Sequence, residues 1–172
     1  MPLLIKEIKP GKMKADAMAL ELVKGMREIG KEIQKDFEKT TKTWKHKPKF
    51  VQTFAIKPGV GPELLVGTDD PIYRYVDEGT KPHLIFAGIY TGKSNKKALA
   101  FGSKFGAKTK PGVIGSTAGM SGGPTVVRPY VSHPGTKARH FDKEIQKRWK
   151  KLFKRRMERA MTKAAKASGH AL

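Results

Sequence analysis

The sequence predicts an α+β domain in which two long helices pack on a small, mainly antiparallel β-sheet, with a long glycine-rich loop between strands. Two observations lead to this fold class. Apolar residues recur at helical spacing near both ends of the chain, over residues 13–42 and 139–167. Between them lie short apolar runs bounded by Gly, Pro or Asp, which is typical of strands joined by turns. At 172 residues the chain has the length of one average domain, so residues 1–172 are expected to form a single domain.

One apolar stripe predicts the first helix. Its members follow one another at steps of three or four residues, which places them on one face of a helix over residues 13–42. They are Met18, Leu22, Met26, Ile29, Ile33 and Phe37. Gly25 and Gly30 interrupt the helix, and each weakens it by about 1 kcal/mol relative to Ala. They are expected to mark a bend or the close approach of another element.

A β-hairpin is predicted directly after this helix. Residues 50–56 alternate in the manner of a strand, with one face formed by Phe50, Phe54 and Ile56. Residues 59–62 read Gly-Val-Gly-Pro, which is typical of a turn, and residues 63–67 then supply the second strand. We expect this hairpin to cover the first helix.

The middle of the chain predicts a short helix and further strands. Asp70 precedes Pro71 as an N-cap residue precedes proline at the first helical position, and Gly79 follows where the helix would end. Residues 71–78 are therefore expected to be helical. Apolar runs indicate further strands at residues 84–86, 98–101 and 126–131.

The composition changes abruptly over residues 91–123. This stretch holds eight glycines and six lysines and has no acidic residue. Such a composition is typical of a flexible arm or long loop. In an oligomer, the arm is expected to order against a neighbouring subunit.

Positive charge is the strongest feature of the composition. Lys and Arg number 36 against 15 Asp and Glu, which gives a net charge of +21 and a pI near 10.2. This excess indicates an anionic neighbour, which is a nucleic acid, a membrane surface or an acidic protein face. The chain has no cysteine, which excludes disulfides and thiolate chemistry. No segment has the roughly 20 apolar residues of a membrane helix, so we expect a soluble protein without a membrane partner.

The second long helix, residues 139–167, carries much of this charge. Residues 139–166 hold 12 Lys and Arg against Asp142, Glu144 and Glu158. A solvated face, a phosphate-binding face and a membrane-surface face are all compatible with such a helix. The candidate contacts to DNA or to an acidic partner are Lys147, Lys150, Lys151, Lys154, Arg155, Arg156 and Arg159.

The search for catalytic chemistry centres on two histidines. His83 and His133 lie in similar Pro-containing turns, and with Asp77 or Glu78 they suggest a metal or acid–base cluster. Their spacing matches no HExxH, facial-triad or His-x-His pattern, and the chain has no nucleophile elbow, Walker loop or dinucleotide fingerprint. Roles in a turn or an interface are therefore favoured, and no catalytic residue, cofactor or metal is expected.

Two short motifs carry the most specific information. Residues 73–83 read Tyr-Arg-Tyr-Val-Asp-Glu-Gly-Thr-Lys-Pro-His, and residues 131–136 read Val-Ser-His-Pro-Gly-Thr. Both are typical of rigid turns. Gly79 permits a positive φ, the Thr80 hydroxyl can bond to nearby backbone, and Pro82 stiffens the entry to the next strand. The Pro-Gly pair of the second motif acts in the same way.

In this order, and with one long helix on either side, the motifs resemble the tail-completion and head-to-tail joining proteins of long-tailed bacteriophages. The resemblance covers about residues 13–167 in layout, although only the two motifs match closely. It implies a ring of subunits between the portal-side connector and the tail tube, with genomic DNA passing through the centre. Its assembly and turn residues are Tyr73, Asp77, Glu78, Gly79, Thr80, Pro82, His83, His133, Pro134, Gly135 and Thr136.

The resulting expectation is a structural virion protein of the neck or upper tail, assembled in the host cytoplasm. Its expected partners are further copies of itself in a homo-oligomeric ring, the neighbouring neck connector, tail-tube or tail-terminator proteins, and genomic DNA in the channel. For the basic helix, an acidic neighbouring ring is slightly favoured over DNA. The alternatives are a sequence-independent nucleic-acid-binding protein that stays monomeric and an enzyme that uses His83 and His133.

Overall fold

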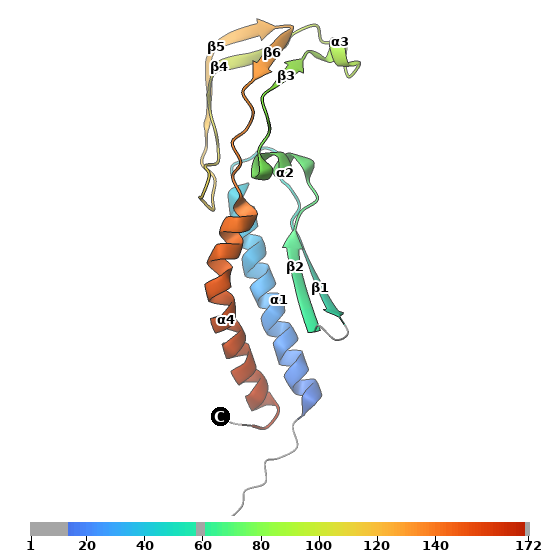
Figure 1. The fold of residues 1–172 in the computed structure, drawn as a ribbon, viewed down its shortest axis with the longest axis vertical. Coiled ribbons are helices and arrows are strands. Elements are labelled where there is room, and N and C mark those ends of the chain that lie inside the picture. The colour runs from blue at the N-terminus through green and yellow to red at the C-terminus, as the bar shows by residue number, and fades with distance from the viewer. Residues whose placement is uncertain (1–13, 58–60, 171–172) are drawn as a thin grey trace, which may run out of the picture.

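The computed structural model describes residues 14–57 and 61–170 (Figure 1). Its helices are α1 (Ala15–Thr40), α2 (Pro71–Glu78), α3 (Gly88–Thr91) and α4 (Phe141–Ala167). Its strands are β1 (Val51–Lys57), β2 (Gly61–Gly67), β3 (His83–Phe86), β4 (Leu99–Gly106), β5 (Met120–Arg128) and β6 (Tyr130–His133). The α+β class is confirmed. The single small sheet expected from the sequence is replaced by three antiparallel pairs, β1–β2, β3–β6 and β4–β5.

The two long helices lie side by side and run in opposite directions along the long axis of the molecule (Figure 1). Both were predicted, with boundaries that agree to within two residues at each described end; residue 13 lies outside the described residues. Their backbones come closest at Gly25, where an added Cβ would lie 2.6 Å from the Cβ of Ala160. Gly25 therefore marks a close approach of another element, which is one of the two roles that the sequence suggested.

An aromatic cluster fills the core between the helices and the rest of the domain. Tyr73 of α2 lies at its centre, with ring centroids 5.1 Å from Phe50, 5.7 Å from Phe141 and 6.3 Å from Phe37. Burial raises the pKa of the Tyr73 hydroxyl above its ordinary value. The buried members of the cluster are Ile29, Phe37, Phe50, Tyr73, Phe141, Ile145 and Trp149. Residues far apart in the sequence thus form one core.

The β1–β2 hairpin covers α1, as predicted (Figure 1). The hairpin needs room at Gly30, where an added Cβ would lie 3.0 Å from Leu64 and would overlap the Gln52 side chain. Of the face predicted for β1, Phe50 is buried and Phe54 is half-buried. Ile56 is 70% exposed. Of the predicted turn, residues 59 and 60 lie outside the described residues, and Gly61 and Pro62 belong to β2.

Helix α2 starts and stops as the sequence predicted. The Asp70 carboxylate accepts a hydrogen bond of 2.8 Å from the amide of Tyr73, and Pro71 occupies the first turn. A hydrogen bond with the His46 imidazole is the largest of the causes that lower the pKa of Asp70 below its ordinary value. Gly79 ends the helix with a φ of +80°, a conformation that other residues rarely adopt.

Strands β3, β4, β5 and β6 together with α3 form a separate part of the molecule, residues 83–133, which we call the head (Figure 1). The strand predicted over residues 126–131 is divided in two here. Its first part belongs to β5 and pairs with β4, and its last part is β6 and pairs with β3. The break falls at Pro129, which has no amide proton to continue a ladder and whose carbonyl accepts from the amide of Ala87.

The segment predicted as a flexible arm or long loop, residues 91–123, contains β4 and the first part of β5, which pair as a β-hairpin. Residues 99–106 pair with residues 120–128 across a register shift between Gly102 and Lys104. The glycines allow this geometry, since Gly122 and Gly123 both have positive φ. The apolar run at residues 98–101 predicted part of β4, whereas composition did not reveal that residues 120–128 pair with it.

The connection between β4 and β5 folds back onto the helices. The Lys108 ammonium donates to the Thr43 carbonyl at 2.9 Å, and the Ser116 hydroxyl donates to the Lys39 carbonyl at 3.1 Å. Arg139, just before α4, donates to the Thr109 hydroxyl at 3.2 Å, and burial lowers the pKa of this guanidinium. The tip of the hairpin therefore caps the carbonyl end of α1 in the same subunit.

Gly25→Ala tests the close contact of the long helices. Helix propensity alone would stabilise this variant by about 1 kcal/mol. The clash with Ala160 is expected to outweigh that gain, because overpacking costs about 1 to 3 kcal/mol. Urea unfolding should therefore show a lower free energy of unfolding for Gly25→Ala than for the wild type.

Ala160→Gly supplies the control for this prediction. The double variant moves one methyl group from α4 to α1. A double-mutant cycle of the unfolding free energies should therefore show a favourable coupling energy between the two changes. Additive effects, or a stabilised Gly25→Ala variant, would contradict the contact.

Candidate assembly and binding surfaces

The two sequence motifs meet in the structure. His83 of β3 lies opposite His133 of β6, and the pairing continues beyond the strands at Thr80 and Thr136. The amide of Thr80 donates to the Thr136 carbonyl at 2.9 Å, and the amide of Thr136 lies 3.1 Å from the Thr80 carbonyl and 2.9 Å from the Thr80 hydroxyl oxygen. The motifs therefore form one antiparallel junction between the helices and the head. The Thr80 hydroxyl bonds to the other motif, whereas the sequence suggested a bond within its own turn.

Two glycines make this junction possible. An added Cβ at Gly79 would lie 2.6 Å from the Thr136 carbonyl oxygen and 2.8 Å from the Ala138 amide nitrogen. At Gly135, whose φ is +87°, an added Cβ would overlap the Thr80 carbonyl oxygen. The positive φ predicted for Gly79 is confirmed, and both glycines also leave room for the other chain segment.

Asp77 connects the junction to α4. Its carboxylate accepts a hydrogen bond from the amide of Phe141, and its carbonyl accepts from the amides of Arg139 and His140, each at 3.0 Å. Burial raises the pKa of Asp77, and the nearby Asp142 carboxylate acts in the same direction, while the bond from Phe141 opposes both. Asp77 thus caps a helix that begins 64 residues later in the sequence.

The two histidine rings lie with their centroids 5.0 Å apart and their planes tilted by 35°. Their Nδ1 atoms have opposite hydrogen-bonding roles. Nδ1 of His83 lies 2.8 Å from the Lys81 carbonyl and must donate to it, whereas Nδ1 of His133 accepts from the Gly135 amide at 3.1 Å. No three His, Cys, Asp or Glu side chains within residues 14–57 and 61–170 are grouped as metal ligands would be. The arrangement is that of a structural cross-strand pair.

The remaining motif residues divide by exposure. Glu78, Pro82 and Pro134 are exposed on the outside of the junction, where a neighbouring molecule can reach them. Tyr73 is buried in the aromatic core, so its side chain is not available for a contact between subunits. Its role in this subunit is packing.

The comparison with family models, with curated proteins and with solved structures gave no match. In the part of the chain that the structure describes, none of the helices has the length and apolar content needed to cross a membrane.

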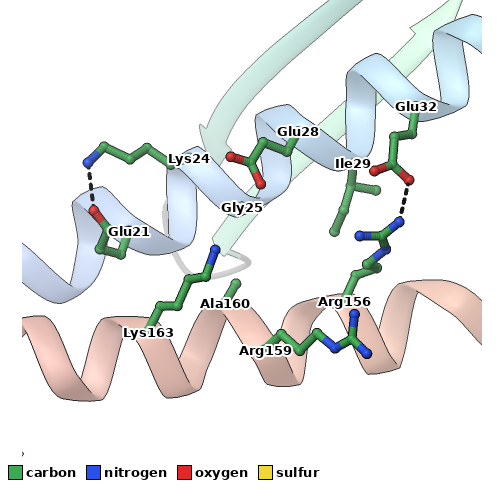
Figure 2. Close-up of a pocket in the computed structure, with 10 residues that line it drawn as sticks. All are labelled: Glu21, Lys24, Gly25, Glu28, Ile29, Glu32, Arg156, Arg159, Ala160 and Lys163. Carbon is green, nitrogen blue, oxygen red and sulfur yellow. Dashed lines mark hydrogen bonds and ion pairs between the residues drawn. The ribbon is translucent and has the colours of Figure 1, made fainter.

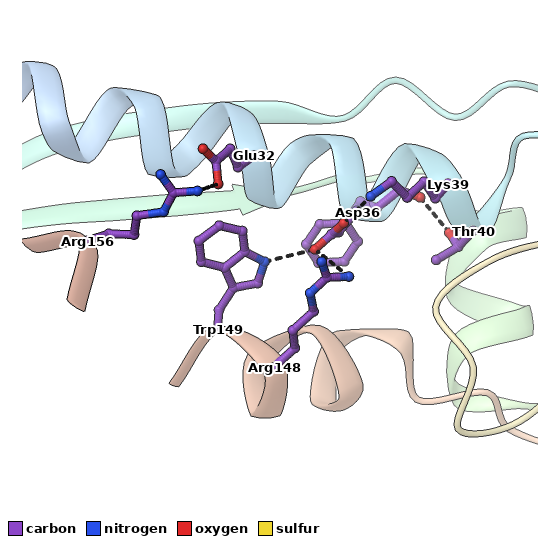
Figure 3. Close-up of polar contacts among 8 residues, drawn as sticks. Glu32, Asp36, Lys39, Thr40, Arg148, Trp149 and Arg156 are labelled. Carbon is purple, nitrogen blue, oxygen red and sulfur yellow. Dashed lines mark hydrogen bonds and ion pairs between the residues drawn. The ribbon is translucent and has the colours of Figure 1, made fainter. Parts of the chain in front are cut away.

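A polar seam, which the sequence did not reveal, joins α1 to α4 (Figure 3). Asp36 of α1 is 2% exposed, and its carboxylate accepts from the Trp149 indole nitrogen at 3.0 Å. Lys39 and Arg148 lie 2.8 Å and 3.4 Å from the same carboxylate. On one side of the apolar stripe of α1, Glu28, Glu32 and Asp36 follow at steps of four, which was the signal available in the sequence.

The seam continues into a groove of about 320 Å³ between the lower parts of the helices (Figure 2). Glu21, Glu28 and Glu32 line it from α1, and Arg156, Arg159 and Lys163 line it from α4. Arg156 pairs with Glu32 at 2.9 Å. Two of the residues predicted to contact DNA or an acidic partner, Arg156 and Arg159, therefore face the acidic side of their own subunit.

The other predicted contacts lie on the outer surface of α4. None of them forms an ion pair with any described residue, and all are exposed. They are opposite the buried stripe of Phe141, Ile145, Trp149 and Ala160. We call this surface the outer basic face, and it consists of Lys143, Lys147, Lys150, Lys151, Lys154 and Arg155.

The head presents the largest set of exposed apolar side chains. Every residue of β3 is exposed, and Phe105 of β4 is 80% exposed. Ile114, in the connection between β4 and β5, packs against the aromatic core, and none of the buried members of that core comes from the described residues of the head. The exposed large apolar residues of the head are Leu84, Ile85, Phe86, Ile89, Tyr90, Phe101, Phe105, Val113, Met120, Val127 and Tyr130.

Asp36→Ala tests the seam. The substitution leaves the buried indole N–H of Trp149 without its acceptor, which costs about 1 to 3 kcal/mol of unfolding free energy. Glu32→Gln is the matched control, because it breaks a solvent-exposed ion pair worth about 0 to 1 kcal/mol. Chemical unfolding followed by tryptophan fluorescence should separate the two variants. Equal losses of unfolding free energy in the two variants would show that the buried hydrogen bond from Trp149 to Asp36 stabilises the fold no more than the exposed ion pair does.

Asp77→Asn tests the buried cap. The folded pKa of Asp77 is raised, so its contribution to stability is fully present below the ordinary pKa of about 3.8 and is lost as the pH rises through the raised value. Asn keeps an oxygen that can accept the hydrogen bond from the Phe141 amide, and its side chain does not become charged as the pH rises. The stability of Asp77→Asn relative to the wild type should therefore increase as the pH rises from about 3 towards neutrality.

Thermal unfolding across this pH range measures the difference. Glu78→Gln removes the same charge from the exposed neighbouring residue and is the control. A difference between Asp77→Asn and the wild type that does not change with pH would contradict the buried carboxylate.

Proposed function

We propose that this protein is a structural virion protein of a tailed bacteriophage that forms a homo-oligomeric ring at the neck or the upper end of the tail. The observation that carries the proposal is the head, which exposes large apolar side chains and in which Ala87 is the one fully buried apolar residue among the described residues. A two-stranded sheet is marginally stable in water by itself. The head therefore has the properties of a surface that is completed by another molecule.

Repetition of one subunit around a ring would supply that molecule. In a heterologous ring the head of each subunit packs on a different surface of its neighbour, so exposed strand edges and apolar faces are covered all the way round. The outer edges of β3, β4, β5 and β6 have no strand partner among the described residues. They are available for pairing between subunits.

The motif junction supports the same proposal. The motifs whose order resembles tail-completion and head-to-tail joining proteins are the two segments that join the head to the helices. A rigid junction gives every subunit the same angle between its two parts, and a closed ring requires such uniformity. The role is mechanical, namely to complete the phage tail and to match it to the DNA-filled head of the phage particle.

A monomeric, sequence-independent nucleic-acid-binding protein is the second candidate. The outer basic face favours it, because these charges have no partner within the subunit. This candidate does not account for the apolar surface of the head, and we therefore place it second.

Phe86→Ser combined with Tyr130→Ser tests the proposed ring. The aromatic side chains of Phe86 and Tyr130 face each other across the β3–β6 pair with ring centroids 6.1 Å apart, and both are exposed. Negative-stain electron microscopy and mass photometry should show rings for the wild type and monomers for the double variant. Ile56→Ser, which changes an exposed apolar residue of the β1–β2 hairpin, should leave the rings intact. A wild type that stays monomeric at high concentration would overturn the proposal.

A further inference from the structure

The charges of α4 are sorted by side. The arginines Arg148 and Arg156 pair with carboxylates of α1, and Arg159 lines the same acidic groove (Figures 2 and 3). The outer basic face holds five lysines and one arginine within 13 residues and no acidic partner among the described residues makes an ion pair with any of them. The inner charges therefore face carboxylates of the same subunit, whereas the outer charges form no ion pair with a described residue.

Like-charged neighbours on the outer basic face repel one another, and the acidic residues at helical spacing from them, Glu144 and Glu158, lie near its two ends. Lys147, Lys151 and Lys154 follow at steps of four and three, so their ammonium groups are neighbours on the helix surface. Each like-charged pair at this spacing is unfavourable by about 0.2 to 0.5 kcal/mol. A partner that neutralises these groups removes the repulsion, and the partner must be dense in negative charge.

We propose that the outer basic face of α4 binds the phosphate backbone of duplex DNA, independently of base sequence. Residues 143–155 extend about 18 Å along the helix at 1.5 Å per residue. A DNA duplex presents roughly ten phosphates over the same length. This inference goes beyond the proposed function, because it concerns what the helix contacts whether or not the subunits form a ring.

The residue types favour DNA over an acidic protein surface. Lysine and other charged residues are depleted from the centres of protein–protein interfaces, where aromatic residues and arginine are enriched. The outer basic face consists almost entirely of lysine, and its residues 143, 147, 150, 151, 154 and 155 include no apolar anchor. Lysine binds phosphate as a point charge and needs no fixed geometry, which suits a backbone contacted without regard to sequence.

Salt dependence provides the test. A fluorescent 30-base-pair duplex is titrated with the full chain at several NaCl concentrations, for the wild type and for the triple variant Lys147→Gln, Lys151→Gln, Lys154→Gln. Each lost phosphate contact lowers the slope of log affinity against log salt by about 0.9, so the triple variant should lose about 3 from the slope. The charge-conserving triple Lys147→Arg, Lys151→Arg, Lys154→Arg should keep the wild-type slope.

A matched control changes net charge by the same amount elsewhere. Lys31, Lys35 and Lys42 are exposed and form no ion pair with a described residue, and their triple change to Gln should leave the slope unchanged. Equal losses in both glutamine triples would overturn the proposal, since net charge alone would then explain binding. Absence of DNA binding at 50 mM NaCl would also overturn it.

A second ligand distinguishes binding to DNA from binding to an acidic protein surface. Poly-L-glutamate is used as a competitor at the same concentration of negative charge as the DNA. DNA should remain bound under these conditions. Displacement of the DNA, with the same dependence on Lys147, Lys151 and Lys154, would assign the outer basic face to an acidic protein instead.

Discussion

The antiparallel contact of α1 and α4 positions every other element of this protein. It depends on two features of very different chemistry, the small residues Gly25 and Ala160 that let the backbones approach and the buried bond from Trp149 to Asp36. A buried carboxylate is stable only when its oxygens have partners, and these come from both helices. The contact therefore specifies the register of the helices as well as their distance. The aromatic core and the β1–β2 hairpin are built against the pair so aligned.

The head depends on this pair through the motif junction. Asp77 caps α4, while Thr80 and Thr136 join the segments that lead to β3 and from β6. The tip of the β4–β5 hairpin returns to the carbonyl end of α1 and to Arg139, so the head is held at two points. The head, with its exposed apolar side chains, is thereby held in a defined orientation relative to the helices.

Charge serves two purposes on α4. The inner arginines Arg156 and Arg159 line the groove with carboxylates of the same subunit (Figure 2). The lysines of the outer basic face are exposed to solvent. Part of the net charge of +21 thus lies in ion pairs that stabilise the fold, and part lies on the outer basic face without an ion-pair partner among the described residues. The sequence slightly favoured an acidic ring as the partner of this face, whereas the predominance of lysine on the outer basic face favours the DNA contact proposed above.

The sequence by itself determined the local elements, since helical spacing, the Asp70 cap and the glycine turns act through neighbouring residues. Both long helices, the first hairpin, α2 and the positive φ of Gly79 were predicted for this reason. Only the tertiary structure decided that the two motifs meet, that Tyr73 is buried, that Arg156 turns inward and that residues 99–106 pair with residues 120–128. These outcomes depend on pairing between residues far apart in the chain, and periodicity or composition carries no information about which distant segments become neighbours.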